Sequence, residues 1–200
     1  MDKKHHISVT GIIIKDGKFL MSEIKPLTLV SGCSFGVLIS EHPENPNKPH
    51  LLRCGKLKVF LITKRAPHKK AFPNTWTVPG GNLEAEDYID LPKDTNHHWY
   101  NIFEKVLRRE VREEGGLEVE KIKYLTSMTF IRPDNAPGLI VSLYADYKSG
   151  EVKLDEDSVE YAWVTSEEAK HYELIDGIYE ELEMLDRVLK GEKVEEWKKK

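Results

Sequence analysis

The sequence has few cysteines, no long hydrophobic run and no large excess of one charge, and each absence excludes a class of protein. Cys33 and Cys54 are its two cysteines, and they lack the paired C-x-x-C spacing of a structural zinc site. A reduced, cytoplasmic location is therefore expected. Nowhere do about 18 apolar residues run together, and residues 1–10 contain no apolar segment of the signal-peptide type, so neither membrane spanning nor secretion is predicted.

The charge balance excludes a further class of partner. Lysine and arginine number 30 against 34 aspartates and glutamates, which gives a formal net charge of -4. No overall positive field is present to hold a nucleic-acid duplex, so a phosphate-bearing partner must be met by local groups. With 200 residues, 40% hydrophobic and 32% charged, the chain is predicted to form one globular domain, with or without appendages.

Hydrophobic patterning predicts a mixture of strands and helices. Strand-like apolar runs occur at 7–14, 34–40, 57–64, 75–78, 122–130, 139–147 and 161–164. The first run is expected to form a hairpin with residues 19–21, and 34–40 is expected to pair with 57–64 across a polar loop. Apolar residues at helical spacing predict helices over 101–114 and 166–190.

The helix predicted over 101–114 carries glutamates where core residues belong. At about 100° per residue, Glu110, Glu113 and Glu114 fall within about 60° of the stripe that includes Val106 and Leu107. Carboxylates that extend a core-facing stripe repel one another and are costly to bury unless a cation compensates. Because carboxylate oxygens are hard ligands and no Cys or His joins them, the expected ion is Mg²⁺ or Mn²⁺. Such ions neutralise substrate phosphates and activate water.

Residues 109–117, Arg-Glu-Val-Arg-Glu-Glu-Gly-Gly-Leu, follow a Pro79-Gly80-Gly81 turn. Together with Gly81 and Asp87 they resemble the Nudix box, G-x5-E-x7-R-E-U-x-E-E-x-G-U, in which U is a bulky apolar residue. The second half matches at every fixed position. In the first half Asp87 stands where the family has Glu, and an inserted loop at 88–100 lengthens the spacing to Arg109, so Glu84 or Glu86 could take its place. The resemblance covers roughly residues 34–175.

This resemblance implies a metal-dependent hydrolase that cleaves a nucleoside diphosphate linked to another moiety, by attack of water on phosphorus. Carried over position by position, Glu110, Glu113 and Glu114 would bind Mg²⁺, with the Gly81 carbonyl as a further ligand. Arg109 would hold a box carboxylate in a bidentate ion pair. One of the glutamates would also orient or deprotonate the attacking water.

Other site residues are less closely specified. The candidates for an additional base or metal ligand are Asp87, Asp155, Glu156, Asp157 and Glu160. The candidates for substrate binding are Arg65, which lies in a basic stretch before the box, Trp76 and Arg132. The expected ligand is a small nucleoside diphosphate derivative, and its identity is left open.

The resemblance implies an α/β fold of the Nudix type, an α/β/α sandwich with a mixed sheet between the box helix and the C-terminal helix, here with an additional N-terminal β-hairpin. The expected domains are a hairpin extension at 1–30, packed on the main domain or a partner subunit, a hydrolase domain at 31–190 and a frayed basic tail at 191–200. An isolated apolar hairpin would expose an edge, which favours a homodimer.

Two other functions fit parts of the pattern. A Nudix-like module could sense a nucleotide sugar or ADP-ribose without cleaving it, but such modules usually have a degraded carboxylate set, and all three helix glutamates are present here. An isopentenyl-diphosphate isomerase has a related fold but depends on a catalytic cysteine, and neither Cys33 nor Cys54 has family-like surroundings. The hydrolase is therefore preferred, with the sensing module as the alternative.

Overall fold

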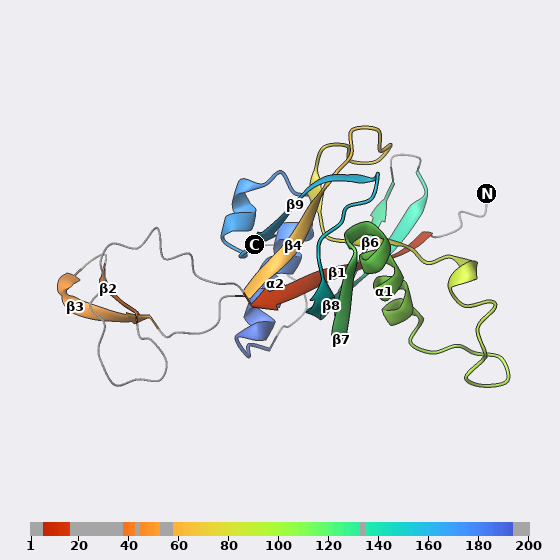
Figure 1. Cartoon of the computed structure of the whole chain (residues 1–200), viewed down its shortest axis with the longest axis horizontal. Helices are drawn as coiled ribbons and strands as arrows, with labels where there is room; N and C mark the ends of the chain where they lie inside the picture. The colour runs from red at the N-terminus through yellow and green to blue at the C-terminus, as the bar shows by residue number, and fades with distance from the viewer. Residues whose placement is uncertain (1–5, 17–37, 43–44, 53–57, 133–134, 194–200) are drawn as a thin grey trace. The chain divides into compact units, whose positions relative to one another are not determined.

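The computed structural model describes residues 6–16, 38–42, 45–52, 58–132 and 135–193 (Figure 1). The chain divides into two compact units, one containing residues 1–15 and 59–200 and the other residues 16–58. In the second unit, β2 (Leu38–His42) pairs antiparallel with β3 (Asn45–Leu52), with Leu38 opposite Leu52. The prediction that residues 34–40 pair with 57–64 was therefore wrong, because a partner much closer in the chain forms this hairpin.

The first unit is built on a seven-stranded mixed sheet. Its strands are β1 (His6–Asp16), β4 (Lys58–Arg65), β5 (Trp76–Thr77), β6 (Gly80–Asn82), β7 (Leu117–Ile131), β8 (Pro137–Gly150) and β9 (Ser158–Val164). The main path runs β5-β4-β1-β8-β7, while β6 pairs with β1 and β9 pairs with β4. β1 and β8 run parallel, from His6 opposite Gly138 to Ile14 opposite Asp146, and β7 and β8 form a long antiparallel hairpin.

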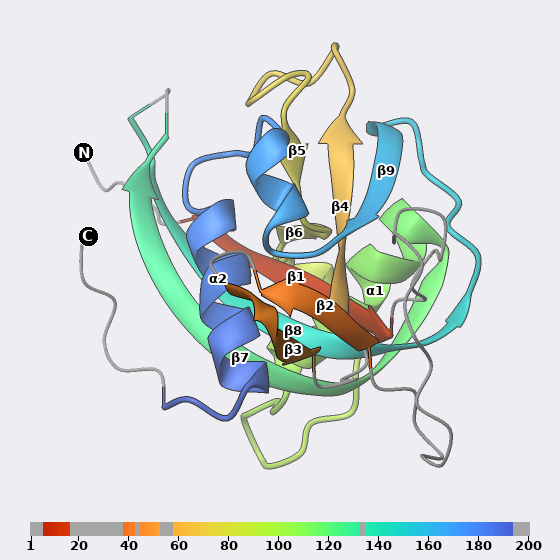
Figure 2. The same cartoon turned by 90° about the vertical axis from the view of Figure 1, so that its left-hand side faces the viewer.

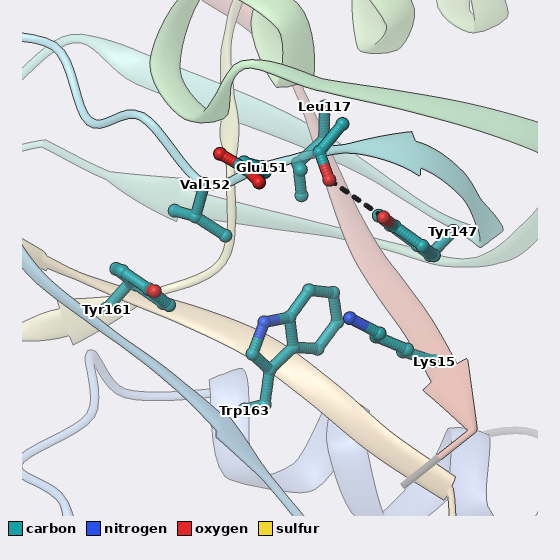
Figure 3. Close-up of a pocket in the computed structure, with 8 residues that line it drawn as sticks. Lys15, Leu117, Tyr147, Glu151, Val152, Tyr161 and Trp163 are labelled. Atoms are coloured by element: carbon teal, nitrogen blue, oxygen red, sulfur yellow. Dashed lines mark hydrogen bonds between the residues drawn. The ribbon is translucent and has the colours of Figure 1, made fainter.

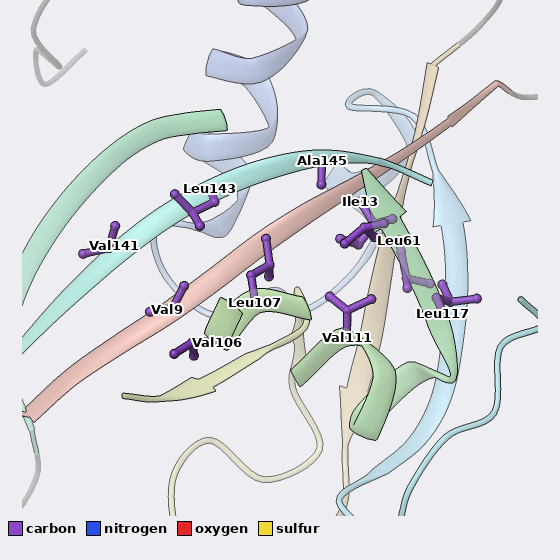
Figure 4. Close-up of a cluster of buried hydrophobic side chains, with 11 residues drawn as sticks. Val9, Ile13, Leu61, Val106, Leu107, Val111, Leu117, Val141, Leu143 and Ala145 are labelled. Carbon is purple, nitrogen blue, oxygen red and sulfur yellow. The ribbon is translucent and has the colours of Figure 1, made fainter. Parts of the chain in front are cut away.

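One face of the sheet is covered by α1 (Ile102–Gly115). Val106 and Leu107 of this helix are fully buried against Val9 and Ile13 of β1 (Figure 4). Gly11 lies between those two strand residues, and a Cβ there would come within 2.2 Å of the Leu107 side chain. The absence of a side chain at this position therefore lets α1 approach the sheet closely.

The opposite face is covered by α2 (Ile178–Leu189), as Figure 2 shows. Ile12 and Ile14, which alternate with the residues facing α1, pack with Leu182 and Leu185 of α2 and with Phe60 of β4. The two apolar clusters on opposite faces make the first unit an α/β/α sandwich, which confirms the predicted fold class.

β1 is a central strand of this sheet rather than an appendage to it. It is paired with β4, β6 and β8, so its edges are satisfied within one chain and need no second subunit. Residues 17–37 lie outside the described residues, so the hairpin expected within 1–30 stays a prediction, as does the homodimer. The expected tail at 191–200 lies mostly outside them as well.

The C-terminal helical segment is shorter than its periodicity predicts. Instead of one helix over 166–190, the structure has a 3-10 turn, η3 (Glu168–His171), and then α2, which begins after Gly177. Between them, the Trp76 N–H donates to the carbonyl of Glu173 and the Ile175 N–H donates to the carbonyl of Trp76, at 2.8 and 2.9 Å. Pairing with β5 and the left-handed backbone of Gly177, with φ of 91°, therefore interrupt the helix.

The inserted loop at 88–100 contains no helix or strand, and a 3-10 turn, η2 (Ala85–Asp87), precedes it. The loop packs on itself: the rings of Tyr88 and Trp99 lie 5.2 Å apart, and the Trp99 indole N–H donates to the Leu91 carbonyl. In the described part of the chain, no helix has the length and apolar character needed to cross a membrane.

Candidate functional site

The C-terminal half of α1 meets the glycine turn at β6. The Gly80 N–H donates a 2.9 Å hydrogen bond to Oε2 of Glu114. Glu110, with a relative exposure of 8%, lies directly over Gly81, where a Cβ would come within 2.1 Å of its Oε1. A glycine at position 81 is therefore required for the carboxylate of Glu110 to reach the turn. Gly80 and Gly81, which the sequence predicts to lie in a turn, also belong to the short strand β6, which pairs with residues 8–10 of β1.

Arg109 holds the carboxylates of this site in place. Its Nη1 lies 2.8 Å from Glu110 Oε1 and 3.0 Å from Glu113 Oε2, and its Nη2 donates to the Asn82 carbonyl. The pKa of Arg109 is raised by its hydrogen bond to Asp87, although partial burial opposes the charge. One guanidinium therefore connects the helix, the glycine turn and η2.

Asp87, one of the three acidic residues considered for the first acidic position of the box, is held by Arg109. Both of its oxygens accept from Arg109, with Nε to Oδ1 at 2.6 Å and Nη2 to Oδ2 at 3.2 Å. Burial works against its ionisation, but the hydrogen bonds from Arg109 and from the Glu84 N–H leave its pKa lowered. These contacts favour Asp87 over Glu84 or Glu86 as the first acidic residue of the box. They also show that Asp87 positions the Arg109 side chain.

Burial raises the pKa values of Glu110 and Glu114. Burial raises the pKa of Glu110, against the opposing effect of Arg109. Burial also raises the pKa of Glu114 to about 7, against the hydrogen bond from Gly80, and the charges of Glu110 and Asp155 add to the increase. Arg65 acts in the opposite direction on Glu114. The site is therefore a partly desolvated cluster with repulsion between carboxylates.

Glu113 differs from the other two helix glutamates. Its side chain is 59% exposed, so it does not continue the buried stripe as the helical projection predicts. It lies on the flank of that stripe, and its length lets it extend along the surface to Arg109, one turn earlier. The basic residues on the other side of the helix, Lys105, Arg108 and Arg112, are exposed.

The carboxylates are not grouped around an ion in this structure. Within the described residues, no three Asp, Glu, His or Cys side chains are grouped as an ion would require, and Arg109 holds Glu110 and Glu113. The charge and chemistry of the cluster nevertheless fit a divalent cation. The available donors are all oxygens, which suits Mg²⁺ or Mn²⁺. Negative charge is also in excess, because the cluster consists of five carboxyl groups and two guanidinium groups: Asp87, Glu110, Glu113, Glu114, Asp155, Arg65 and Arg109.

The acidic run before β9 contributes one residue to this cluster. Asp155 is half-buried, and its charge acts on Glu114. Its neighbours have other surroundings: Glu156 is exposed, Asp157 accepts from Lys69 at 2.5 Å, and Glu160 pairs with Lys64 at 2.6 Å. The sequence could not separate Asp155 from these residues, because all of them are acidic and lie in one polar segment.

The residues expected to bind substrate are spread over different parts of the unit. Arg65, at the end of β4, is close enough to influence Glu114, and its Nε donates to the Ala71 carbonyl. Trp76 packs edge-on against Tyr172, with ring centroids 4.8 Å apart, next to the apolar cluster that faces α2. Arg132 lies in the turn between β7 and β8, where its N–H donates to the Ala136 carbonyl.

The sequence and the fold are both similar to those of known proteins. A family model described as the NUDIX domain matches residues 50–185. The nucleoside triphosphatase NudI of Escherichia coli is 32% identical over 126 residues, and the match covers 58% of this chain and 79% of that protein.

Solved structures with the same fold have lower sequence identity. A MutT protein from Methanosarcina mazei Go1 has a TM-score of 0.56 and 18% identity over 95% of this chain and 99% of its own. The NUDIX domain of Shewanella oneidensis NrtR, complexed with ADP ribose, has a TM-score of 0.57 and 12% identity over 94% and 90%. A NUDIX hydrolase from Alicyclobacillus acidocaldarius has a TM-score of 0.59 and 11% identity over 92% and 91%.

Proposed function

Because this chain belongs to the NUDIX domain family and is a Nudix hydrolase, we propose that it cleaves the diphosphate linkage of a nucleoside diphosphate derivative in a reaction that requires Mg²⁺ or Mn²⁺. The observation that carries the proposal is the pair of carboxylates formed by buried Glu110 and half-buried Glu114, placed against Gly81 and Gly80 and flanked by Arg109. A surface helix with a chance run of charges would leave both of them in solvent.

Glu110, Glu113 and Glu114 would hold the metal, with the Gly81 carbonyl as a further ligand. When bound, such an ion neutralises phosphate charge and lowers the pKa of a coordinated water. The excess negative charge of the cluster supports this assignment, since a divalent cation would relieve the repulsion that now accompanies burial. Glu110 and Glu113 both contact Arg109 Nη1, and Glu113, which is the more exposed of the two, would exchange that contact for the ion.

The chain's own residues then have distinct tasks. Arg109 and Asp87 fix the position of Glu110, and the Gly80 N–H fixes that of Glu114. A carboxylate of this cluster accepts a proton from the attacking water, whose oxygen forms a bond to phosphorus while the bond from phosphorus to the bridging oxygen breaks. The leaving phosphate takes the electron pair of that bond. Arg65, the cationic residue next to Glu114, is the best placed to meet the substrate's phosphates.

Nucleoside triphosphates are the substrate class that we propose within this wider group. Support comes from the similarity to NudI, a nucleoside triphosphatase that matches this chain over 79% of its own length. A triphosphate is itself a nucleoside diphosphate linked to a further phosphate, so this narrower assignment agrees with the general one.

The test is a hydrolysis assay on nucleoside triphosphates, nucleotide sugars, ADP-ribose and dinucleoside polyphosphates, each with Mg²⁺, Mn²⁺ or EDTA. Glu114→Gln removes one charge from the cluster, and Glu118→Gln is its matched control, because Glu118 pairs with Arg112 on the surface. We expect metal-dependent turnover in the wild type and in Glu118→Gln, and loss of turnover in Glu114→Gln. Turnover that is unchanged in Glu114→Gln or in EDTA would contradict the proposal.

Binding without turnover would favour the sensing module instead. The binding of the same compounds is therefore measured by calorimetry on the wild type. A compound that binds tightly and is not hydrolysed with either metal would contradict the hydrolase mechanism and support recognition alone.

A further inference from the structure

A surface cavity of about 330 Å³ opens beside the end of α1, and it has no role in the chemistry described so far (Figure 3). Its walls include three aromatic side chains, Tyr147 from β8 and Tyr161 and Trp163 from β9. Lys15, at the end of β1, and Glu151 supply charged groups. This volume is at the lower end of the range for small-molecule sites, which combine apolar walls with a few polar groups.

The aromatic walls form an ordered group. The rings of Tyr147 and Trp163 meet edge to face with centroids 6.0 Å apart, and the Tyr147 hydroxyl is held by the Gly150 carbonyl at 2.7 Å. Lys15 Nζ lies 4.6 Å from the Tyr147 ring and 5.2 Å from the Trp163 ring. Tyr161 is 47% exposed, so much of its ring remains open to contact with a ligand.

The cavity lies next to the carboxylate cluster along the chain. Leu117, one of its lining residues, begins β7 immediately after α1, and Glu114 lies in the last turn of that helix. The Lys153 N–H donates to the Gly115 carbonyl at 3.0 Å, and this bond ties the segment containing Glu151 to the end of α1. Farther along the same segment, Asp155 acts on Glu114.

The strands provide a second connection between the two places. Tyr161 lies opposite Thr63, and Arg65 comes two residues after Thr63 on β4, a distance of about 7 Å along the strand. A ligand with an aromatic group at Tyr161 and a phosphate at Arg65 would therefore need only a short spacer, which is the arrangement of base, ribose and phosphates in a nucleotide.

We propose that this cavity binds the aromatic base of the substrate nucleotide, stacked on the exposed ring of Tyr161, while its phosphates lie at Arg65 and the carboxylate cluster. The inference rests on the proposed function and narrows the substrate to compounds that carry a base. Lys15 makes a ligand cation unfavourable, because its ammonium group already occupies the negative faces of the Tyr147 and Trp163 rings. Because the Lys15 ammonium group donates hydrogen bonds, it favours a base with acceptor atoms, such as the N7 of a purine.

The test compares GMP with ribose 5-phosphate, which lacks the base, by calorimetric titration in Mg²⁺. Tyr161→Ala removes the ring and Tyr161→Phe keeps it. Tyr124→Ala is the matched control, because Tyr124 is another exposed strand tyrosine, 61% accessible, that does not line the cavity. Stacking energies predict that Tyr161→Ala weakens GMP binding by about ten- to a hundredfold. Tyr161→Phe and Tyr124→Ala are expected to bind GMP as the wild type does, and Lys15→Gln about threefold more weakly.

Ribose 5-phosphate is expected to bind equally to all of these variants. The proposal is overturned if Tyr161→Ala binds GMP with wild-type affinity, or if the wild type binds GMP no better than ribose 5-phosphate. Triphosphate hydrolysis separates this result from failure of the proposed function. Hydrolysis with an unchanged KM in Tyr161→Ala would reject the base site alone, whereas Tyr161-dependent GMP binding in a protein that hydrolyses nothing would reject the hydrolase alone.

Discussion

Glu114 of α1 and Glu181 of α2 lie on opposite faces of one sheet, and burial raises the pKa of each to about 7. Their surroundings differ. Glu114 accepts from the Gly80 N–H within a cluster of other charges. Glu181, with a relative exposure of 3%, accepts from the Ser142 hydroxyl at 2.6 Å, and its Oε2 is the one buried side-chain oxygen in the described residues that has no hydrogen-bond partner.

This comparison shows that a raised pKa does not by itself identify a functional carboxyl group. Glu181 faces a polar pair inside the sheet, Ser142 and Thr10, whose hydroxyl oxygens lie 3.2 Å apart on neighbouring strands. No cationic group contributes to the raised pKa of Glu181, and the charge of Glu180 raises that pKa further. Glu114 has acidic neighbours, a guanidinium and a glycine turn, which supports the proposal that a cation and a phosphate bind beside it. The neighbouring groups decide the role.

The largest expected difference between the two glutamates is in catalysis. Glu114→Gln should lower kcat by about a thousandfold, because loss of a metal ligand removes charge stabilisation in the transition state. Glu181→Gln should keep kcat within about threefold of the wild type, because Glu181 is on the other face of the sheet from the site. Steady-state hydrolysis of the best substrate measures both. Equal losses in the two variants would break the distinction.

The dependence of stability on pH should reveal the buried carboxyl group of Glu181. The folded-state pKa of Glu181 lies above its unfolded value of 4.5, so its protonated form is stabilising below that value and the stabilisation is lost as pH rises through about 7. The size of the shift corresponds to about 3 kcal/mol. Urea unfolding at pH 5 and pH 8 should show that Glu181→Gln becomes more stable relative to the wild type by about that amount at the higher pH. A difference that is independent of pH would refute this assignment.

The effect of Mg²⁺ on stability should also differ between variants at Glu114 and at Glu181. Mg²⁺ at about 100 times its dissociation constant should increase the free energy of unfolding by about 2.7 kcal/mol, since it binds the folded chain. We expect this increase in the wild type and in Glu181→Gln, and little or none in Glu114→Gln. Thermal unfolding across a MgCl₂ titration, with NaCl at matched ionic strength as control, measures it. An equal increase in all three proteins would place the ion elsewhere.

The smallest expected effect concerns the support of the cluster. Asp87→Asn removes the charge that pairs with Arg109 and should reduce stability by about 1 to 2 kcal/mol, since the carboxylate is nearly buried in this pair. Glu86→Gln, a change in the same 3-10 turn at an exposed position, is the matched control and should have no measurable effect. Urea unfolding at pH 7 compares the two. Wild-type stability in Asp87→Asn would show that Arg109 needs no partner there.

The sequence was most informative where structure is local. Helix α1 begins and ends within a residue of its predicted bounds, because its apolar spacing and the terminal glycines are properties of neighbouring residues. The same periodicity placed Glu110 and Glu114 on the buried side. It could not show that Glu113 would be exposed, because a flanking position on the helix leaves a long side chain free to follow a local ion pair.

Contacts between distant segments were much harder to predict. The parallel pairing of β1 with β8 joins residues more than a hundred positions apart, and no local pattern distinguishes a central strand from an arm of a separate hairpin. The same reason applies to Asp155, whose approach to Glu114 depends on how the segment after β8 packs against the end of α1. The cavity beside Trp163 needs four separate segments and has no signature in any one of them.

The junction between β1 and β4 has a consequence for protein engineering. Asp16, at the end of one strand, forms a 2.7 Å ion pair with Lys58, at the start of the other, and the two strands are neighbours in the sheet. Both ends of the intervening segment are therefore held together by the sheet itself. The entropy of closing a loop grows only with the logarithm of its length, by about 0.6 kcal/mol for each doubling. This junction should accept chain segments of very different lengths while the sheet keeps its register.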